Sequence, residues 1–199
     1  MMPKVIGLTG QTGSGKSTVD HIFAERDFEI IDADLVSRQV VQKGSECLNR
    51  LSEHFGGYIL TAAGELNRSA LASIVFRDKN QLARLNKIIY PYILKEIYLR
   101  IDKAALQGKQ YILLDAPTLY ESEASDLCDF VIAIVADPAI RLKRIIQRDH
   151  LTEAAAKARI SAQHSDDFYR QRADIVIENN GDLSQLESEI NAVIDELKS

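Results

Sequence analysis

One short segment constrains the fold of this chain more than any other feature. Residues 10–18 read GQTGSGKST, which satisfies the pattern G-x-x-x-x-G-K-[ST]. A short β-branched run at residues 4–9 precedes the segment, and a stretch with a helical apolar face follows it. A glycine-rich loop between a strand and a helix is typical of proteins that wrap the phosphates of a nucleoside triphosphate. A glycine-rich turn that feeds an ordinary helix is the plainer alternative.

Each residue type in this segment has a chemical reason. Glycines allow a turn in which successive backbone N–H groups converge on phosphate oxygens. The helix that begins near Lys16 adds the positive end of its dipole, Lys16 can reach the β- and γ-phosphates, and Ser17 can ligate Mg²⁺. We expect the nucleotide to contact Gly13, Ser14, Gly15, Lys16 and Ser17.

The composition argues against some classes of partner. The chain has 199 residues, of which 46% are hydrophobic and 27% charged, so we expect one globular domain with at most a modest insertion. Its formal net charge of −5 argues against a protein that coats nucleic acid or an anionic membrane. The net charge does not exclude a local site for a small anion. Four of the ten glycines fall between residues 7 and 15, which points to such a site in this segment.

The cysteines and the apolar runs indicate the cellular compartment of the protein. Cys47 and Cys128 have neither metal-ligand spacing nor the density of a disulfide framework, which favours the reducing cytosol. The first ten residues lack the apolar core and cleavage site of a signal peptide, and the longest apolar run, residues 130–136, is too short to span a bilayer. We therefore expect a cytoplasmic protein without a membrane segment.

The hydrophobic pattern predicts an α/β protein. Continuous apolar runs favour strands buried on both faces of a parallel sheet, and helical periodicity appears between them. Strands that alternate with helices indicate a doubly wound domain. We predict the three-layer fold of P-loop NTPases with a five-stranded parallel sheet. The expected strands are 4–9, 29–32, 111–115, 130–136 and 174–178.

One long gap interrupts this alternation. No convincing strand occurs between Asp32 and Tyr111, which is far more chain than one crossover needs. Helical faces fill the gap, and a long one resumes around Pro91. We predict a helical insertion over residues 34–106 that binds substrate, on a nucleotide-binding core of residues 1–33 and 107–199. Extra core helices without a binding role are the alternative.

Acidic residues follow two of the expected strands. Asp115 ends the run YILLD at the carboxyl edge of the sheet, where ligands bind in such folds, and it could hold Mg²⁺ directly or through water. Asp32 and Asp34 also follow a strand, and a base that accepts an alcohol proton belongs at such a place. Helix or turn capping by these carboxylates is the alternative.

A row of arginines supplies the opposite charge. Asp137-Pro138 opens a predicted helix on which Arg141, Arg144 and Arg148 share one face. Arginines beside a phosphate-binding loop can neutralise a phosphoryl group in transfer, and a closing lid can deliver them. We expect such a lid within about residues 138–172, although a solvated charged face would give the same pattern.

Taken together, these residues resemble the dephospho-coenzyme A kinase family almost from end to end. Several of the matching segments have no general role in phosphate binding, so the resemblance is specific. The segments are GLTGQTGSGKST (7–18), IDADLVSR (31–38), Phe55-Gly56, GELNR (64–68), LNKIIYP (85–91), DAPTLYE (115–121), RIIQRD (144–149), Gln163 and ADIVIENNG (173–181).

The resemblance implies a kinase that transfers the γ-phosphoryl group of ATP to the ribose 3′-hydroxyl of dephospho-coenzyme A, the last step of coenzyme A biosynthesis. By position, Asp34 is implied as the base or orienting carboxylate, and Lys16, Ser17 and Thr18 as the phosphate and Mg²⁺ contacts. Arg148 is implied as the lid arginine, with Arg144 as a secondary candidate that would also contact the nucleotide. Arg38 and Arg68 fall where family arginines flank the acceptor. Mg²⁺ is the implied metal, and we expect a monomer or a small homo-oligomer.

The sequence departs from the family at three positions. Gln11 replaces a second glycine after Gly10, Tyr90 replaces the histidine of a His-Pro pair, and Thr118 interrupts a usual Pro-Leu-Leu. None of these changes touches a residue expected to do the chemistry. Tyr90 puts in doubt any role for an imidazole at that position.

Other functions remain open on sequence grounds. Another small-molecule kinase, acting on a nucleoside, a nucleotide or a sugar acid, would use the same loop. A nucleotide-dependent switch would bind ATP or GTP without an acceptor, but no Asn-Lys-x-Asp guanine-reading segment occurs. A nucleic-acid ATPase would be expected to carry a basic surface signature, which is lacking in this acidic chain.

Overall fold

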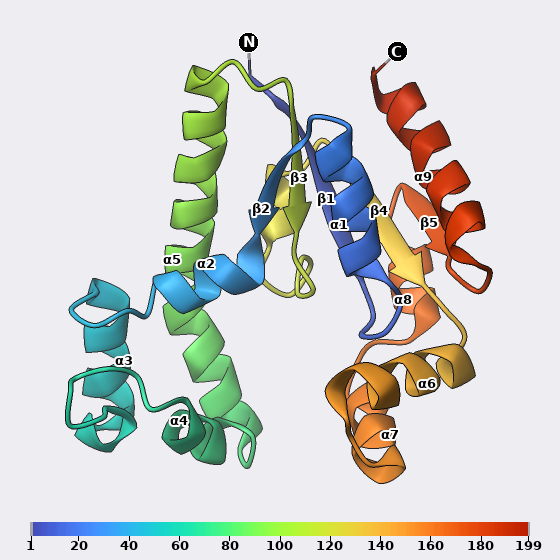
Figure 1. Ribbon diagram of the computed structural model, residues 1–199. Helices are drawn as coiled ribbons and strands as arrows, with labels where there is room; N and C mark the ends of the chain where they lie inside the picture. Colours follow the sequence, from blue (N-terminus) through green and yellow to red (C-terminus); the bar gives the residue numbers. More distant parts are fainter. Residues whose placement is uncertain (1, 199) are drawn as a thin grey trace. The chain divides into compact units, whose positions relative to one another are not determined.

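The computed structural model describes residues 2–198, and its chain divides into two compact units (Figure 1). The first unit runs to Ile31 and resumes at Ala104, and the second is Asp32–Lys103. Each unit is described by itself below.

A five-stranded sheet organises the first unit. Its strand order is β2-β3-β1-β4-β5, and the pairs β1–β3, β1–β4 and β4–β5 are parallel. The predicted α/β class and all five predicted strands are confirmed, with ends that shift by one residue at most. The strands are β1 (Lys4–Gly10), β2 (Glu29–Asp32), β3 (Tyr111–Asp115), β4 (Phe130–Val135) and β5 (Ile175–Glu178).

The central strand carries the glycine-rich loop. Leu8 of β1 lies in register with Asp115 of β3 and Ile132 of β4, so β1 has a hydrogen-bonded neighbour on both sides. Leu8 and Ile132 are completely buried, as expected for a parallel sheet covered on both faces. The loop that follows β1 therefore starts from a buried strand that is held on both sides.

Helices cover this sheet and gather at one of its ends. α1 (Lys16–Glu25) and α9 (Leu183–Lys198) pack on the apolar core through Val19, Phe23 and Ile190. α6, α7 and α8 lie at the end of the sheet toward which β1 and β4 point (Figure 1). Their bounds are α6 (Pro138–Asp149), α7 (Glu153–Ser161) and α8 (Asp166–Arg170), and a short 3₁₀ turn, η2, spans Ala124–Leu127.

The second unit is helical. Side chains cap its helices: Asp32 accepts a hydrogen bond from the N–H of Leu35, Ser45 from Leu48 and Asn67 from Ala70. Its core joins buried residues such as Cys47, Leu51 and Leu71. The elements are α2 (Ala33–Gln39), α3 (Glu46–Phe55), the 3₁₀ turn η1 (Gly57–Ile59), α4 (Arg68–Val75) and α5 (Lys79–Leu106).

The sequence pattern suggests that a long helix resumes around Pro91, but Pro91 does not start a new helix. α5 is a single helix of 28 residues with Pro91 in its interior. An interior proline removes one backbone donor and costs about 3 kcal/mol. The burial of apolar side chains further along α5, such as Ile93 and Ile97, is favourable and offsets that cost. Within residues 2–198, no helix is long and apolar enough to cross a membrane.

Candidate nucleotide-binding site

The loop between β1 and α1 has the backbone of a phosphate cradle. Gly10 and Gly15 have φ values of 141° and 106°, which residues with a side chain rarely adopt. A Cβ atom on Gly10 would meet the carbonyl oxygen of Ile134 at 2.2 Å, and one on Gly15 would meet Asn179 Nδ2 at 2.3 Å. Both positions therefore require glycine for conformation and for space.

The start of α1 is open to an anion. Its N-cap, Gly15, has no side chain to accept a hydrogen bond, so the first N–H groups of the helix are left for a ligand. Lys16 Nζ lies 3.4 Å from the carbonyl oxygen of Gly10, a long contact that a phosphate can replace, and Ser17 is exposed. The Ser14 hydroxyl is buried, and no hydrogen-bond partner is found for it among the described residues. This arrangement fits the phosphates of a nucleotide.

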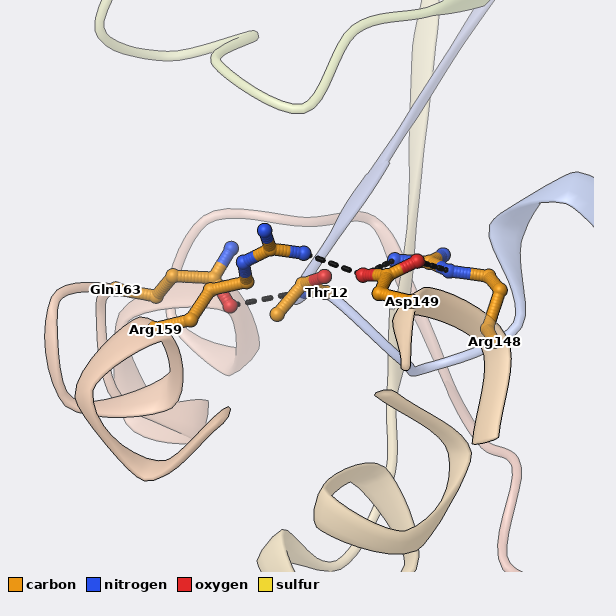
Figure 2. Close-up of polar contacts among 5 residues, drawn as sticks. All are labelled: Thr12, Arg148, Asp149, Arg159 and Gln163. Atoms are coloured by element: carbon orange, nitrogen blue, oxygen red, sulfur yellow. Dashed lines mark hydrogen bonds and ion pairs between the residues drawn. The ribbon is translucent and has the colours of Figure 1, made fainter. Parts of the chain in front are cut away.

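A buried arginine and a glutamine hold Thr12 of the loop. Gln163 Oε1 accepts hydrogen bonds from the Thr12 N–H at 2.9 Å and from Arg141 at 3.1 Å (Figure 2 shows the first of these). Arg141 Nε donates to the Thr12 carbonyl at 3.0 Å. Arg141 is only 2% exposed, and burial lowers the pKa of its guanidinium from the usual value. Thr12 is thus fixed through both its N–H and its C=O.

Arg144 and Asn179 hold the next turn of the loop. Asn179 Nδ2 donates to the Ser14 carbonyl at 2.7 Å. Arg144 donates to the Asn179 carbonyl at 3.1 Å and lies 3.4 Å from the carbonyl oxygens of Gly13 and Ser14. Its guanidinium therefore neutralises carbonyl dipoles beside the cradle. The sequence placed Arg144 near the nucleotide but gave no role to Asn179.

Gln11 shows what replaces the glycine usual at its position. Its side chain is 2% exposed, and Nε2 donates to the His164 carbonyl at 3.0 Å and to Asp166 Oδ1 at 2.8 Å. These bonds join the loop to the start of α8. A glycine could not make them, so this departure adds an anchor to the loop.

The end of α6 carries an arginine pair around one carboxylate. Arg148 donates to both oxygens of Asp149, at 2.7 and 2.9 Å, and Arg159 of α7 donates to the same carboxylate (Figure 2). Hydrogen bonding by Arg148 is the largest cause that lowers the pKa of Asp149, and the charges of Arg148 and then Arg159 add to it, so this pKa is about 2. The same hydrogen bond raises the pKa of Arg148 above its usual value, so Arg148 is a permanent cation.

The remaining predicted residues divide between the two units. Asp115 is the last residue of β3, beside the central strand. Asp34 and Arg38 are exposed on the same face of α2, one turn apart, and Arg68 is the first residue of α4. Asp34 follows β2 by two residues along the chain. The structure therefore groups Gly13–Thr18, Arg144 and Asp115 in the sheet unit, and Asp34, Arg38 and Arg68 in the helical unit.

A parallel sheet with a G-x-x-x-x-G-K-[ST] loop between β1 and α1, and arginines on a neighbouring helix, defines a P-loop kinase. The family model described as dephospho-CoA kinase matches residues 4–185. The chain belongs to the dephospho-CoA kinase family, a family of phosphotransferases that act on an alcohol group in the last step of coenzyme A biosynthesis.

Individual relatives agree with this placement. A dephospho-CoA kinase of Bacillus cereus is 37% identical over 193 residues, which cover 97% of this chain and 96% of the relative. A crystal structure of TT1252 from Thermus thermophilus aligns with a TM-score of 0.81 at 29% identity, over 99% of both chains. The dephospho-CoA kinase of Campylobacter jejuni aligns with a TM-score of 0.72 at 28% identity, over 98% of both chains.

Proposed function

We propose that this chain transfers the γ-phosphoryl group of ATP to the ribose 3′-hydroxyl of dephospho-coenzyme A. The observation that carries the proposal is the anchored phosphate cradle of residues 10–18, in a chain whose family match extends over residues 4–185. P-loop kinases take ATP as the donor, which fits the open start of α1.

The residues of the cradle would work by position and charge. Lys16 and the first N–H groups of α1 would bind the β- and γ-phosphates, with Ser14, Thr18 and Arg144 as further contacts. Ser17 and Asp115 would hold Mg²⁺, which supplies charge neutralisation between the β- and γ-phosphates when it is bound. Two protein oxygens suit this ion, because Mg²⁺ usually keeps waters and phosphate oxygens as its other ligands.

Acceptor chemistry would fall to the helical unit and to α6. Asp34 would accept or orient the proton of the 3′-hydroxyl, and Arg38 and Arg68 would flank the bound acceptor. Arg148 would neutralise charge on the phosphoryl group in transfer. The exposure of Asp34, Arg38 and Arg148 supports these assignments, since each side chain can reach a ligand.

A variant of Asp34 tests the acceptor assignment. Asp34→Asn keeps the size of the side chain but removes its charge, so turnover of dephospho-coenzyme A should fall by about a hundredfold while the ATP dissociation constant changes little. Turnover comes from a coupled ADP assay and affinity from nucleotide titration. A variant that turns over at a near-normal rate would remove Asp34 from catalysis.

Arg148 has a matched control in Arg159, because both side chains bind Asp149. With MgATP saturating, Arg148→Ala should lower kcat by more than about tenfold, whereas Arg159→Ala should keep most of it. Equal losses in the two variants would mean that Arg148 serves only the packing of α6 against α7. A change confined to the Michaelis constant for ATP would make it a ground-state contact.

The acceptor itself is tested with a panel of alcohols. Dephospho-coenzyme A should be phosphorylated far faster than adenosine, a nucleoside monophosphate or a sugar acid. Preference for one of the others would assign the chain a different acceptor.

We place this activity in the cytoplasm, where the free thiols Cys47 and Cys128 suit a reducing environment, and in a monomer or small homo-oligomer.

A further inference from the structure

A basic pocket lies within the helical unit, between α3 and α5. Its volume is about 520 Å³, which is in the range of small-molecule sites. None of the acceptor residues proposed above, Asp34, Arg38 or Arg68, lines it. Its ionisable lining consists of Glu46, Arg50, His54, Arg84, Lys87 and Lys95.

The charge of this pocket opposes that of the whole chain. Four lysines and arginines and one histidine face a single carboxylate, Glu46, in a chain of net charge −5. Glu46 is already engaged, because it lies 3.2 Å from Arg50 and accepts a hydrogen bond from the Tyr92 hydroxyl at 2.9 Å. A second carboxylate, Glu53, lines an adjoining hollow and is not among the residues of the pocket.

Three of the cations are left without an anion. Among residues 2–198, no ion pair or hydrogen bond is found for the side chains of Arg84, Lys87 or Lys95. Arg84, Lys87 and Lys95 recur at helical spacing along α5, and they face Arg50 and His54, which are one turn apart on α3. Like charges at such spacings destabilise a helix pair unless an anion lies between them.

The wall of the pocket is apolar and partly aromatic. Ile88, Pro91 and Tyr92 line it between the cations, and the Arg50 guanidinium lies 5.9 Å from the centre of the Tyr92 ring. Arginine binds phosphate through two parallel N–H donors, and lysines add point charges. An organic group can pack on the apolar wall while its phosphates meet the cations.

We propose that this pocket binds a small phosphorylated molecule through a diphosphate group. Two linked phosphates match several separated cations better than a single carboxylate does. The diphosphate could belong to the acceptor substrate, which carries one, or to a separate phosphorylated metabolite. Binding of diphosphate in the pocket does not depend on the proposed function. Only the choice between these two sources of the diphosphate rests on that function.

Inorganic diphosphate tests the site in the full-length protein. Amide chemical shifts measured by NMR in metal-free buffer report the pocket (α3 and α5) and the P-loop separately, so binding at one is not mistaken for binding at the other. We expect saturable shifts around Arg50 and Lys87. Shifts that do not saturate by about 10 mM, or that sulfate at matched ionic strength reproduces, would overturn the proposal.

Two double variants on α5 supply the matched comparison. Lys87→Ser/Lys95→Ser removes two pocket cations, whereas Lys79→Ser/Lys103→Ser removes two exposed lysines of the same helix that do not line the pocket. The first should weaken diphosphate binding in the pocket by about tenfold or more, and the second by less than about twofold. Equal affinities would sink the proposal. Arg84→Ser provides an independent reading should the first variant fold poorly.

Steady-state kinetics then distinguishes the two sources. If the acceptor supplies the diphosphate, Lys87→Ser/Lys95→Ser should raise the Michaelis constant for dephospho-coenzyme A with kcat and the ATP constant unchanged. If that constant stays the same while diphosphate binding is lost, the pocket serves a separate phosphorylated metabolite. A chain that does not phosphorylate dephospho-coenzyme A at all would contradict the proposed function but leave the diphosphate titration intact.

Discussion

Gly15 joins the phosphate-binding loop to α1 with a φ of 106°, and a Cβ atom placed on it would meet Asn179 Nδ2 at 2.3 Å. The side-chain amide of Asn179 donates to the Ser14 carbonyl, and this hydrogen bond holds the middle of the loop. One added methyl group would therefore act twice: it would strain the backbone, and it would push Asn179 out of its hydrogen bond.

Gly15→Ala should weaken ATP binding by about tenfold or more and destabilise the fold by roughly 1–3 kcal/mol. Gly44→Ala is the matched control, because Gly44 also has a positive φ, 82°, but nothing lies within 4 Å of its Cβ position. The control should lose only about 1 kcal/mol of stability and bind ATP normally. Nucleotide titration and urea unfolding measure both effects. Equal ATP affinities in the two variants would show that backbone strain alone matters at Gly15.

At the scale of elements, one carboxylate joins α6 to α7. Asp149 ends α6 and accepts hydrogen bonds from Arg148 of the same helix and from Arg159 of α7. If Arg148 contacts the phosphoryl group as proposed, this carboxylate would act as a positioning residue for it. The connection depends on pH, since its strength requires that Asp149 be ionised.

The pKa of Asp149 is lowered from 3.8 to about 2, so its ionised form is favoured in the folded chain. Its contribution to stability is therefore complete above about pH 4 and is lost as the pH falls toward 2. The urea midpoint of Asp149→Asn should lie below that of the wild-type chain near pH 6, and the difference should shrink by about pH 3. Glu153→Gln is the control, because the partner of Glu153, Lys157, lies in its own helix and the pair cannot join α6 to α7. An acid dependence of equal size in the control would contradict the role of Asp149.

Across the whole molecule, local patterns predicted the fold but not the long-range contacts that anchor the phosphate-binding loop. The strands and the loop follow from short apolar runs and from glycine spacing, and they were found within a residue of their ends. The anchors of the loop were missed as such, because Thr12 and Gln163 are 151 residues apart and Ser14 and Asn179 are 165 apart. No periodicity encodes contacts over such separations. Pro91 was misread for the opposite reason, since a local rule was overridden by the packing of α5.

The thiol and phenol groups of the sheet unit whose pKa is shifted by burial share one direction of shift. Burial raises the pKa of Cys128, Tyr120 and Tyr169 to about 12 each. In the helical unit, burial likewise raises the pKa of Cys47 to about 11. In every case the fold favours the protonated form, so the folded chain holds protons that the unfolded chain releases at high pH.

This shared direction makes the stability of the protein sensitive to alkali. Below about pH 9 these groups are mostly protonated in the folded and the unfolded chain, so they do not reduce the free energy of unfolding. As the pH rises toward 11–12, the unfolded chain releases these protons first, and stability is lost. We expect the free energy of unfolding to fall by about 2 kcal/mol or more between about pH 8 and about pH 10.5. Urea unfolding at the two pH values measures this change, and Cys47→Ala/Cys128→Ala should flatten it. An equal slope in that variant would assign the alkaline loss to other groups and contradict the role of the two thiols.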